Sequence, residues 1–205
     1  MNNNAYPAIH AKLEQLRPTQ MTVGYEEVSL KRKEWRERTS KDAKQFLRAH
    51  RFPAICGPNS HYYIVDHHHL GRALLEEKVG AVTVSVLSDL SHLDKDEFWI
   101  VMDHHQWTHP YDEKGKRRDF SDMPKKLEQL RDDPYRSLAA EVRRAEEYPK
   151  DITPFSEFLW ADFFRRRISL ATLREDPDGA LDQAKKLAQK REAAHLPGWS
   201  QISKS

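Results

Sequence analysis

Three consecutive histidines, preceded by an aspartate and followed by an arginine, form the densest group of reactive side chains in the sequence. They are Asp66, His67, His68, His69 and Arg72. Histidine can transfer a proton, donate to phosphate or ligate a metal, and aspartate can orient a histidine, bind a cation or act as a base. Arginine offers a fork that matches phosphate oxygens. We therefore expect Asp66, His68 and His69 to be catalytic, and His67 and Arg72 to bind phosphate or a nucleotide.

The flanking sequence predicts that this group lies where a strand gives way to a helix. His61 to Val65 is rich in aromatic and β-branched residues, which favour strands, and Leu70 to Lys78 predicts a helix that ends near Gly80. A helix that begins directly after a strand directs free N–H groups and its positive dipole end at the turn, which favours an anion there. Because Arg72 lies four residues after His68, both should project from the same side of this helix.

Not every histidine of the group can serve one site. Side chains of successive residues point in different directions in a strand or a helix. At least one of His67, His68 and His69 should therefore face solvent or pack structurally.

A metal site is an open alternative at the same turn. Histidine and carboxylate ligands suit zinc, manganese or iron, and Asp66 and His68 could act together with Asp103, His104 and His105. Neither a His-Glu-x-x-His helix nor a Cys/His finger spacing occurs, and His105 lies on an apolar helix face that predicts a core position. The metal stays unassigned, with Asp66 and His68 as candidate ligands. The cofactor hypothesis is a divalent cation, Mg²⁺ or Mn²⁺, with a nucleotide.

A second polar segment could contribute to the same site. Trp107 to Asp112, together with Lys116 and Arg117, could fold over the histidine turn as a lid or basic rim, or remain a solvated loop. In the first case Lys116 and Arg117 would bind phosphate or a nucleotide. Residues that could support the site from behind are Asp103, His104, Tyr111, Tyr135 and Arg136.

The remaining sequence predicts an α+β fold. Ala81 to Leu87 alternates with period two and is strongly β-branched, which predicts a strand, and Phe52 to Cys56 predicts another. Thr22 to Leu30 is expected to form a strand or a strand and a turn. Helices are expected from Ser40 to His50, after Asp94, and after the pairs Asp133-Pro134, Thr153-Pro154 and Asp176-Pro177, in which a capping residue precedes proline.

These elements divide the 205 residues into three parts. We expect an extended N-terminal lead-in over residues 1–15 and a compact mixed α/β domain over residues 16–112. A helical C-terminal region over residues 113–205 is expected to pack on that domain.

Composition limits the classes of function. The chain has 34 basic and 32 acidic residues and a formal net charge of +2, so no global charge excess favours nucleic acid, although local basic patches remain open. The single cysteine, Cys56, excludes an internal disulfide and a multi-cysteine zinc site, and its apolar surroundings predict a buried position. No apolar run is long enough to span a bilayer, and no signal-peptide pattern occurs. We expect a soluble cytoplasmic protein without a membrane partner, and self-association into a homo-oligomer is open.

One string in the chain resembles a known motif. Tyr62 to Leu74 is similar to the central motif of the ParB/sulfiredoxin superfamily, in which a strand ends in Asp-Gly-x-His-Arg or Gly-x-Arg-Arg-x-Arg-Ala and a helix follows. Further strings in the same order, among them 16–20, 132–139 and 158–163, resemble the bacterial ParB-like nuclease branch over about residues 14–170. By position, Asp66 matches the motif aspartate, His69 the motif histidine or first arginine, and Arg72 the closing arginine. His67 stands where the motif usually has glycine, and Leu70 where it usually has arginine.

The resemblance implies a compact α/β domain that holds a nucleotide or phosphate group at the helix start. In related families this site serves CTP binding and hydrolysis, ATP-dependent sulfinate reduction or phosphoryl transfer to serine. It also implies that Gln20 contributes to phosphate or nucleotide binding. Three functions stay open: a nuclease or another enzyme that acts on a phosphate-containing substrate, a non-catalytic nucleotide- or nucleic-acid-responsive binding module with a degenerate site, and a structural protein that self-associates.

Overall fold

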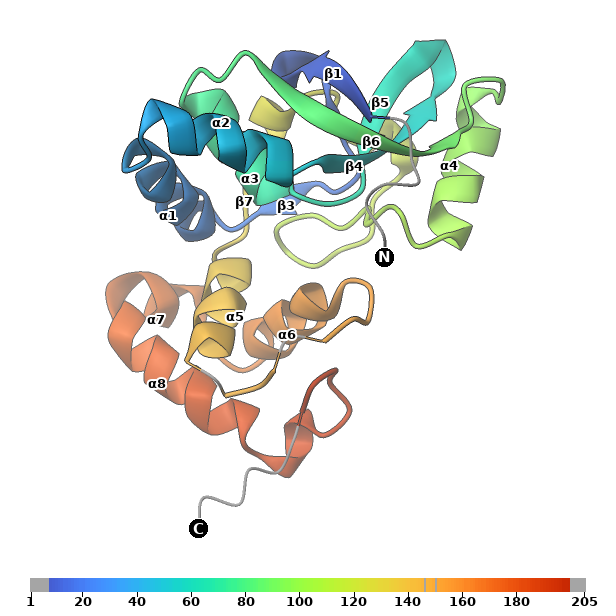
Figure 1. Ribbon diagram of the computed structural model, residues 1–205. Helices are drawn as coiled ribbons and strands as arrows, with labels where there is room; N and C mark the ends of the chain where they lie inside the picture. Colours follow the sequence, from blue (N-terminus) through green and yellow to red (C-terminus); the bar gives the residue numbers. More distant parts are fainter. Residues whose placement is uncertain (1–7, 146, 150, 200–205) are drawn as a thin grey trace. The chain divides into compact units, whose positions relative to one another are not determined.

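The computed structural model describes residues 8–145, 147–149 and 151–199, which divide into two units (Figure 1). The first unit runs to Val23 and continues from Glu27 to Asp132, and the second comprises Gly24–Glu26 and the chain from Asp133 onward. The elements up to Asp132 are β1 (Ala8–Lys12), η1 (Leu13–Gln15), β2 (Arg17–Pro18), β3 (Thr22–Val23), α1 (Tyr25–Arg36), α2 (Ser40–Ala49), β4 (Phe52–Gly57), η2 (Pro58–Ser60), β5 (His61–Ile64), α3 (His68–Glu76), β6 (Ala81–Asp89), α4 (Lys95–His104), η3 (Phe120–Asp122), η4 (Leu127–Gln129) and β7 (Arg131–Asp132).

A five-stranded mixed sheet organises the first unit. Its strand order is β1-β6-β4-β5-β2. The central strand β4 is parallel to β6 and antiparallel to β5, and β1 is antiparallel to β6. The short β2 pairs with β5 in parallel, and β3 and β7 form a separate parallel pair. The strands predicted at 52–56, 61–65 and 81–87 are all present.

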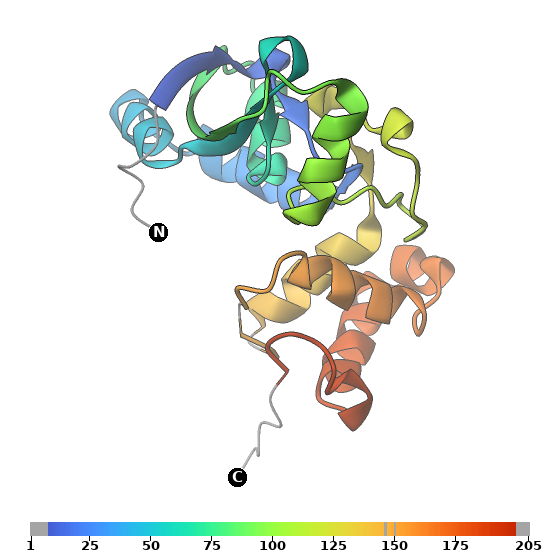
Figure 2. The same cartoon turned by 90° about the vertical axis from the view of Figure 1, so that its right-hand side faces the viewer.

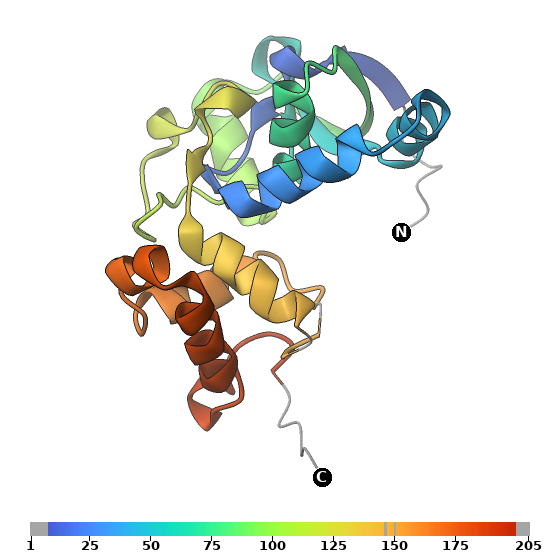
Figure 3. The same cartoon turned by 90° about the vertical axis from the view of Figure 1, so that its left-hand side faces the viewer.

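Helices cover both faces of this sheet. In β4, the neighbours Ala54 and Ile55 are both fully buried. Ala54 belongs to the hydrophobic cluster that contains Leu74 of α3, and Ile55 to the cluster that contains Phe98 of α4. A strand covered on both faces loses the apolar–polar alternation of a half-exposed strand. Figure 2 shows α4 foremost, and Figure 3 shows α1 foremost from the opposite side.

The second unit is helical. It contains α5 (Pro134–Arg144), α6 (Ser156–Arg165), α7 (Leu170–Glu175), α8 (Pro177–Ala188) and η5 (Arg191–Ala193). Its core includes Trp160, on which the ring of Tyr148 stacks at 3.9 Å. The predicted caps Asp133 and Asp176 are confirmed, since their side chains accept from backbone N–H groups in the first turns of α5 and α8.

Two local predictions were wrong. Only Thr22–Val23 of the segment 22–30 is a strand, because the chain from Tyr25 forms α1 and buries Val28 on one helical face. Thr153 does not cap α6; that helix begins at Ser156, with Phe155 in a left-handed conformation at the N-cap. The short helix α7 was not predicted, and Ser169 caps it.

The ends of the first unit also differ from the sequence division. Ala8–Lys12, which the sequence places in a lead-in, pairs with β6 as an edge strand, and residues 1–7 lie outside the described residues. The unit continues past residue 112 to Asp132, because Leu127 and Leu130 complete its hydrophobic core with 1% exposure each. Short 3₁₀ turns around Leu127 carry too little periodicity to predict this role.

The packing of α4 against the sheet gives a stability prediction. A Cβ atom on Gly57 would lie 2.7 Å from ring atoms of both Phe98 and Tyr63. We therefore expect Gly57→Ala to lower the free energy of unfolding by about 1–3 kcal/mol, the usual range for overpacking. Urea denaturation followed by tryptophan fluorescence measures the change.

Gly80→Ala is the matched control, because a Cβ atom there meets no atom within 4 Å. Its unfolding free energy should stay within about 0.5 kcal/mol of the parent protein. Equal stability of Gly57→Ala and Gly80→Ala would contradict the close contact between β4 and α4.

Candidate functional site

The predicted strand-to-helix junction is present, and its turn has an unusual backbone. β5 ends at Ile64 and α3 begins at His68, with His67 at the N-cap in the left-handed region (φ 67°, ψ 24°). The N–H group of His67 donates to the Asp66 carboxylate at 2.6 Å, and its ring packs edge-on against Phe52. Glycine adopts this conformation without steric cost, which accounts for the motif glycine that His67 replaces.

His68 is part of the scaffold of this turn. Its side chain is buried, and its Nε2 accepts a hydrogen bond from the backbone N–H of Thr19 at 3.1 Å. A ring nitrogen that accepts a hydrogen bond carries no proton, so this geometry fixes a neutral ring with its proton on Nδ1. The sequence predicts a catalytic His68, and in the structure its ring also joins the start of α3 to Thr19, the residue after β2.

Thr19 joins three segments at this point. Its hydroxyl donates to the carbonyl of Ile64 at 2.8 Å, at the end of β5. Its own carbonyl accepts from the hydroxyl of Thr108 at 2.9 Å and from the N–H of His109 at 2.8 Å. The segment that begins at Thr108 is therefore tied to the start of α3 through Thr19 and His68. Nothing in the sequence around a single threonine signals this role.

The loop after Thr108 is built on one buried carboxylate. Asp112 accepts from the N–H groups of Lys114 and Lys116, each at 2.9 Å, and from Arg118 Nε at 2.7 Å. Burial alone would raise the pKa of Asp112, but these hydrogen bonds outweigh it and hold the pKa below its usual value. Lys116 is exposed on this loop.

Residues expected near the histidine turn make local contacts of their own. Arg117 pairs with Asp103 at 2.9 Å, and the ring of Tyr111 stacks on His109 at 4.4 Å. His104 is exposed at the end of α4. His105 is also exposed and stacks on Trp107, so its predicted core position was wrong.

The metal alternative gains no support from this arrangement. Within residues 8–145, 147–149 and 151–199, no three histidine, cysteine, aspartate or glutamate side chains gather as a metal site would require. Asp103 is engaged with Arg117. The two histidine-aspartate strings at 66–69 and 103–105 therefore do not combine into one ligand set.

Gln20, Tyr135 and Arg136 are all buried. Gln20 donates through Nε2 to the carbonyl of Thr22 at 2.8 Å. In the second unit, the hydroxyl of Tyr135 donates to the carbonyl of Ile168 at 2.8 Å, and the guanidinium of Arg136 lies 3.8 Å from the ring centre of Phe158. These contacts give each of the three residues a structural role in its own unit.

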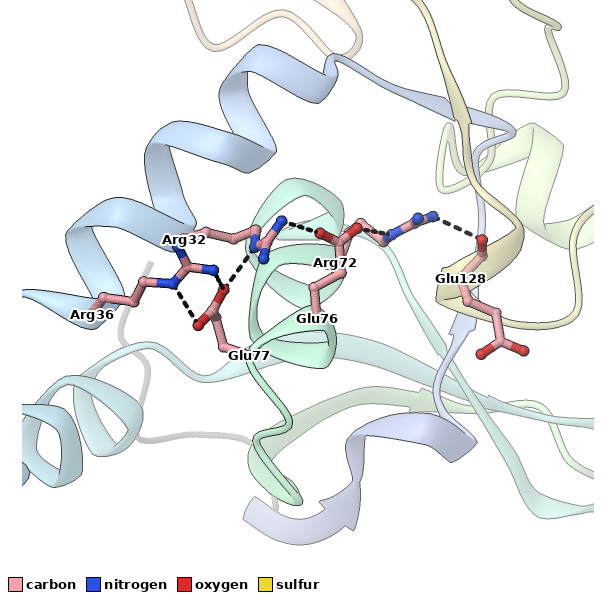
Figure 4. A network of polar contacts seen from close by, with 6 residues as sticks. All are labelled: Arg32, Arg36, Arg72, Glu76, Glu77 and Glu128. Carbon is pink, nitrogen blue, oxygen red and sulfur yellow. Dashed lines mark hydrogen bonds and ion pairs between the residues drawn. The ribbon is translucent and has the colours of Figure 1, made fainter.

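Arg72 holds a distant segment in place. Its Nε donates to Glu76 at 2.6 Å, and its Nη1 donates to the carbonyl of Glu128 at 2.7 Å (Figure 4). The same Nη1 donates to the carbonyls of Leu127 (3.4 Å) and Leu130 (3.1 Å). The guanidinium of Arg72, which the sequence predicts to bind phosphate, thus donates to carbonyls in and next to η4. His68 contacts the segment between β2 and β3, and Arg72 contacts the segment around η4, although the two residues are one helical turn apart.

Arg72 also belongs to an ion-pair network between α1 and α3. Figure 4 shows Arg32 between Glu76 and Glu77, at 2.7 Å from each. Arg36 donates to both carboxylate oxygens of Glu77 at 2.7 and 2.8 Å. These bonds from Arg36 and Arg32 lower the pKa of Glu77 to about 2.

Comparison with known proteins agrees with this fold and turn. Residues 9–166 match the model of the family described as "Putative ParB-like nuclease". The chain belongs to this family. The ParB-like match begins within β1 and ends just after α6, so it includes the strand-to-helix turn and the segment that Arg72 holds.

A solved structure extends the comparison beyond the ParB-like match. The crystal structure of protein Atu1540 from Agrobacterium tumefaciens is 49% identical, with a TM-score of 0.88. The alignment covers 95% of this chain and 98% of that one. No curated protein matches the chain. Among the described residues, every helix is too short or too polar to cross a membrane.

The buried His68 bond gives a second stability prediction. His68→Ala removes the acceptor for the Thr19 N–H group and leaves a cavity, so we expect a loss of about 2–4 kcal/mol in unfolding free energy. His104→Ala, at an exposed histidine, should cost less than about 0.5 kcal/mol. Chemical denaturation compares the two, and equal losses would contradict a scaffold role for His68.

The network around Glu77 predicts a dependence of stability on acid. Its pKa is about 2 in the folded chain, against an ordinary value of 4.5. Its stabilising contribution is therefore complete above pH 4.5 and is lost as the pH falls from there towards 2. Denaturation midpoints of the parent and Glu77→Gln should differ at pH 6 and converge near pH 2. If the difference between the two denaturation midpoints stayed the same near pH 2, the stabilising role of ionised Glu77 would be contradicted.

Proposed function

We propose that the chain binds a nucleotide or a phosphodiester at the start of α3 and acts on its phosphate ester. The observation that carries the proposal is the junction itself. The side chain of His67, at the N-cap of α3, does not cap the helix. The start of this helix lies next in sequence to Asp66, whose carboxylate is accessible. Such a helix end favours an anion.

Within this proposal, His69 is the proton-transfer residue and Asp66 orients it or holds a cation. The side chain of Asp66 is 74% exposed, and His69 is partly exposed on the first turn of α3. A divalent cation, Mg²⁺ or Mn²⁺, would suit the carboxylate oxygens of Asp66 and would supply charge neutralisation at the phosphate. Lys116 comes from the loop that Thr19 ties to the same turn, and it would add a cation for the phosphate.

Membership of the ParB-like nuclease family supports a phosphate-containing substrate. Nuclease activity in particular comes from the family description, and we propose it as the reaction to test first. The formal charge of +2 offers no broad attraction for nucleic acid, so a short strand or a free nucleotide fits the chain better than a long duplex.

A binding module without turnover is the second candidate. Two guanidinium groups that could bind phosphate are missing or engaged elsewhere, which favours this candidate. Leu70 stands at a motif arginine position and is 7% exposed in the core, and Arg72 is bonded to η4. Fewer cationic donors at the turn weaken transition-state stabilisation more than they weaken ligand binding.

The test combines ligand-dependent thermal shift with turnover. Nucleotides and a short single-stranded oligonucleotide are screened with Mg²⁺, with Mn²⁺ and with EDTA, using the parent chain, Asp66→Asn and His69→Ala. A ligand that binds the native state raises the melting temperature with its concentration. We expect a shift that both variants weaken, and hydrolysis that His69→Ala lowers by at least about 100-fold.

His10→Ala and Asp182→Asn are matched controls at exposed positions and should behave like the parent. Binding without turnover in any condition would favour the binding module. Unchanged shift and turnover in both site variants would overturn the proposed site.

A further inference from the structure

A pocket of about 320 Å³ lies in the first unit, lined by residue 21 and by residues 122–125, 129 and 131. None of Asp66, His67 and His69 lines it. Its apolar part consists of Met21, Met123 and Pro124, of which the two methionines are buried. The volume is close to the lower end of the range for small-molecule sites. The pocket can therefore take a compact ligand on an apolar floor.

Three hydrogen-bond donors surround that floor. Gln129 accepts from the N–H groups of Lys125 (2.8 Å) and Lys126 (3.1 Å) through the same oxygen, Oε1, which fixes its amide and leaves the NH₂ group as a donor. Among the described residues, the ammonium of Lys125 forms no ion pair. Arg131 meets Glu113 only at 3.4 Å, and 63% of its side chain is exposed.

The lining of the pocket carries more positive than negative charge, although Glu113, outside the lining, pairs with Arg131. Two cations, Lys125 and Arg131, and one carboxylate, Asp122, give a formal charge of +1 on the lining residues. The carboxylate of Asp122 also acts on Arg118, which lies outside the lining. Gln129 adds a neutral donor to the two cations.

The frame of the pocket is fixed from two sides. The N–H of Arg131 donates to the carbonyl of Met21 at 3.1 Å, where β7 pairs with β3. On the other side, Arg72 bonds the carbonyls of Leu127, Glu128 and Leu130, which flank Gln129 in the sequence. The backbone that carries the three donors is therefore held in place before a ligand arrives, and only their side chains must be ordered on binding.

We propose that this pocket binds a small phosphate monoester that carries an apolar group. The phosphate meets Lys125, Gln129 and Arg131, whose two cations match its double negative charge. The apolar group rests on Met21 and Met123, because methionine is polarisable and adapts to flat or irregular surfaces. This site is separate from the α3 turn and does not depend on the function proposed there.

The test uses phenyl phosphate, inorganic phosphate and benzoate as probes in isothermal titration calorimetry of the full chain. We expect phenyl phosphate to bind more tightly than inorganic phosphate, which lacks the apolar group, and than benzoate, which carries one negative charge. Lys125→Ala and Arg131→Ala should each weaken phenyl phosphate binding about tenfold.

Lys126→Ala is the matched control, because Lys126 is the neighbouring exposed lysine and does not line the pocket. It should bind phenyl phosphate like the parent, and so should the double variant Asp66→Asn, His69→Ala. The pocket would be overturned as the site if Lys125→Ala and Lys126→Ala lost equal affinity for phenyl phosphate, or if the double variant lost affinity. The absence of binding at about 10 mM phenyl phosphate would overturn it as well. Equal affinity for phenyl phosphate and benzoate would overturn the assignment to a phosphate.

Discussion

The hydrogen bond from the Thr19 N–H group to the buried Nε2 of His68 is the contact on which the geometry of the candidate site depends. It fixes the first residue of α3 relative to β2, and the other bonds of Thr19 reach the end of β5 and the start of the loop at Thr108. A buried backbone N–H without an acceptor is costly, so the segment after Pro18 and the start of α3 must stay together. His68, one of the two histidines predicted to be catalytic, thus holds the turn on which its neighbours Asp66 and His69 lie.

Arg72 shows how a motif arginine can be used for architecture. Three carbonyls around η4 accept from its Nη1, and Glu76 accepts from its Nε. A short 3₁₀ turn satisfies few of its carbonyls by itself, and a planar cation on another helix can donate to several carbonyls in and after it. The segment that this arginine holds also completes the hydrophobic core through Leu127 and Leu130. It reaches on to Arg131, one of the donors of the proposed phosphate pocket.

The two departures from the motif have different physical consequences. His67 keeps the left-handed backbone that glycine would adopt easily, and its hydrogen bond to Asp66 and its contact with Phe52 help to offset the steric cost. Leu70 replaces a charged side chain with one that packs in the core. The turn therefore retains its shape while it loses positive charge, and any phosphate bound there depends more on the helix end.

The sequence by itself determined the strands, predicted at 52–56, 61–65 and 81–87, the helix after the histidines and the caps at Asp133 and Asp176. In each case the information is local, in β-branched alternation or in a capping side chain before proline. The sequence also placed the turn at Asp66–His69, and its motifs carried the resemblance to the family. Only the tertiary structure decided that His68 and Arg72 bond to Thr19 and η4, that His105 is exposed and that the first unit reaches Asp132. Those outcomes depend on residues about 50 positions away in the chain, such as Thr19 and Leu127, and composition or periodicity carries no record of such long-range contacts.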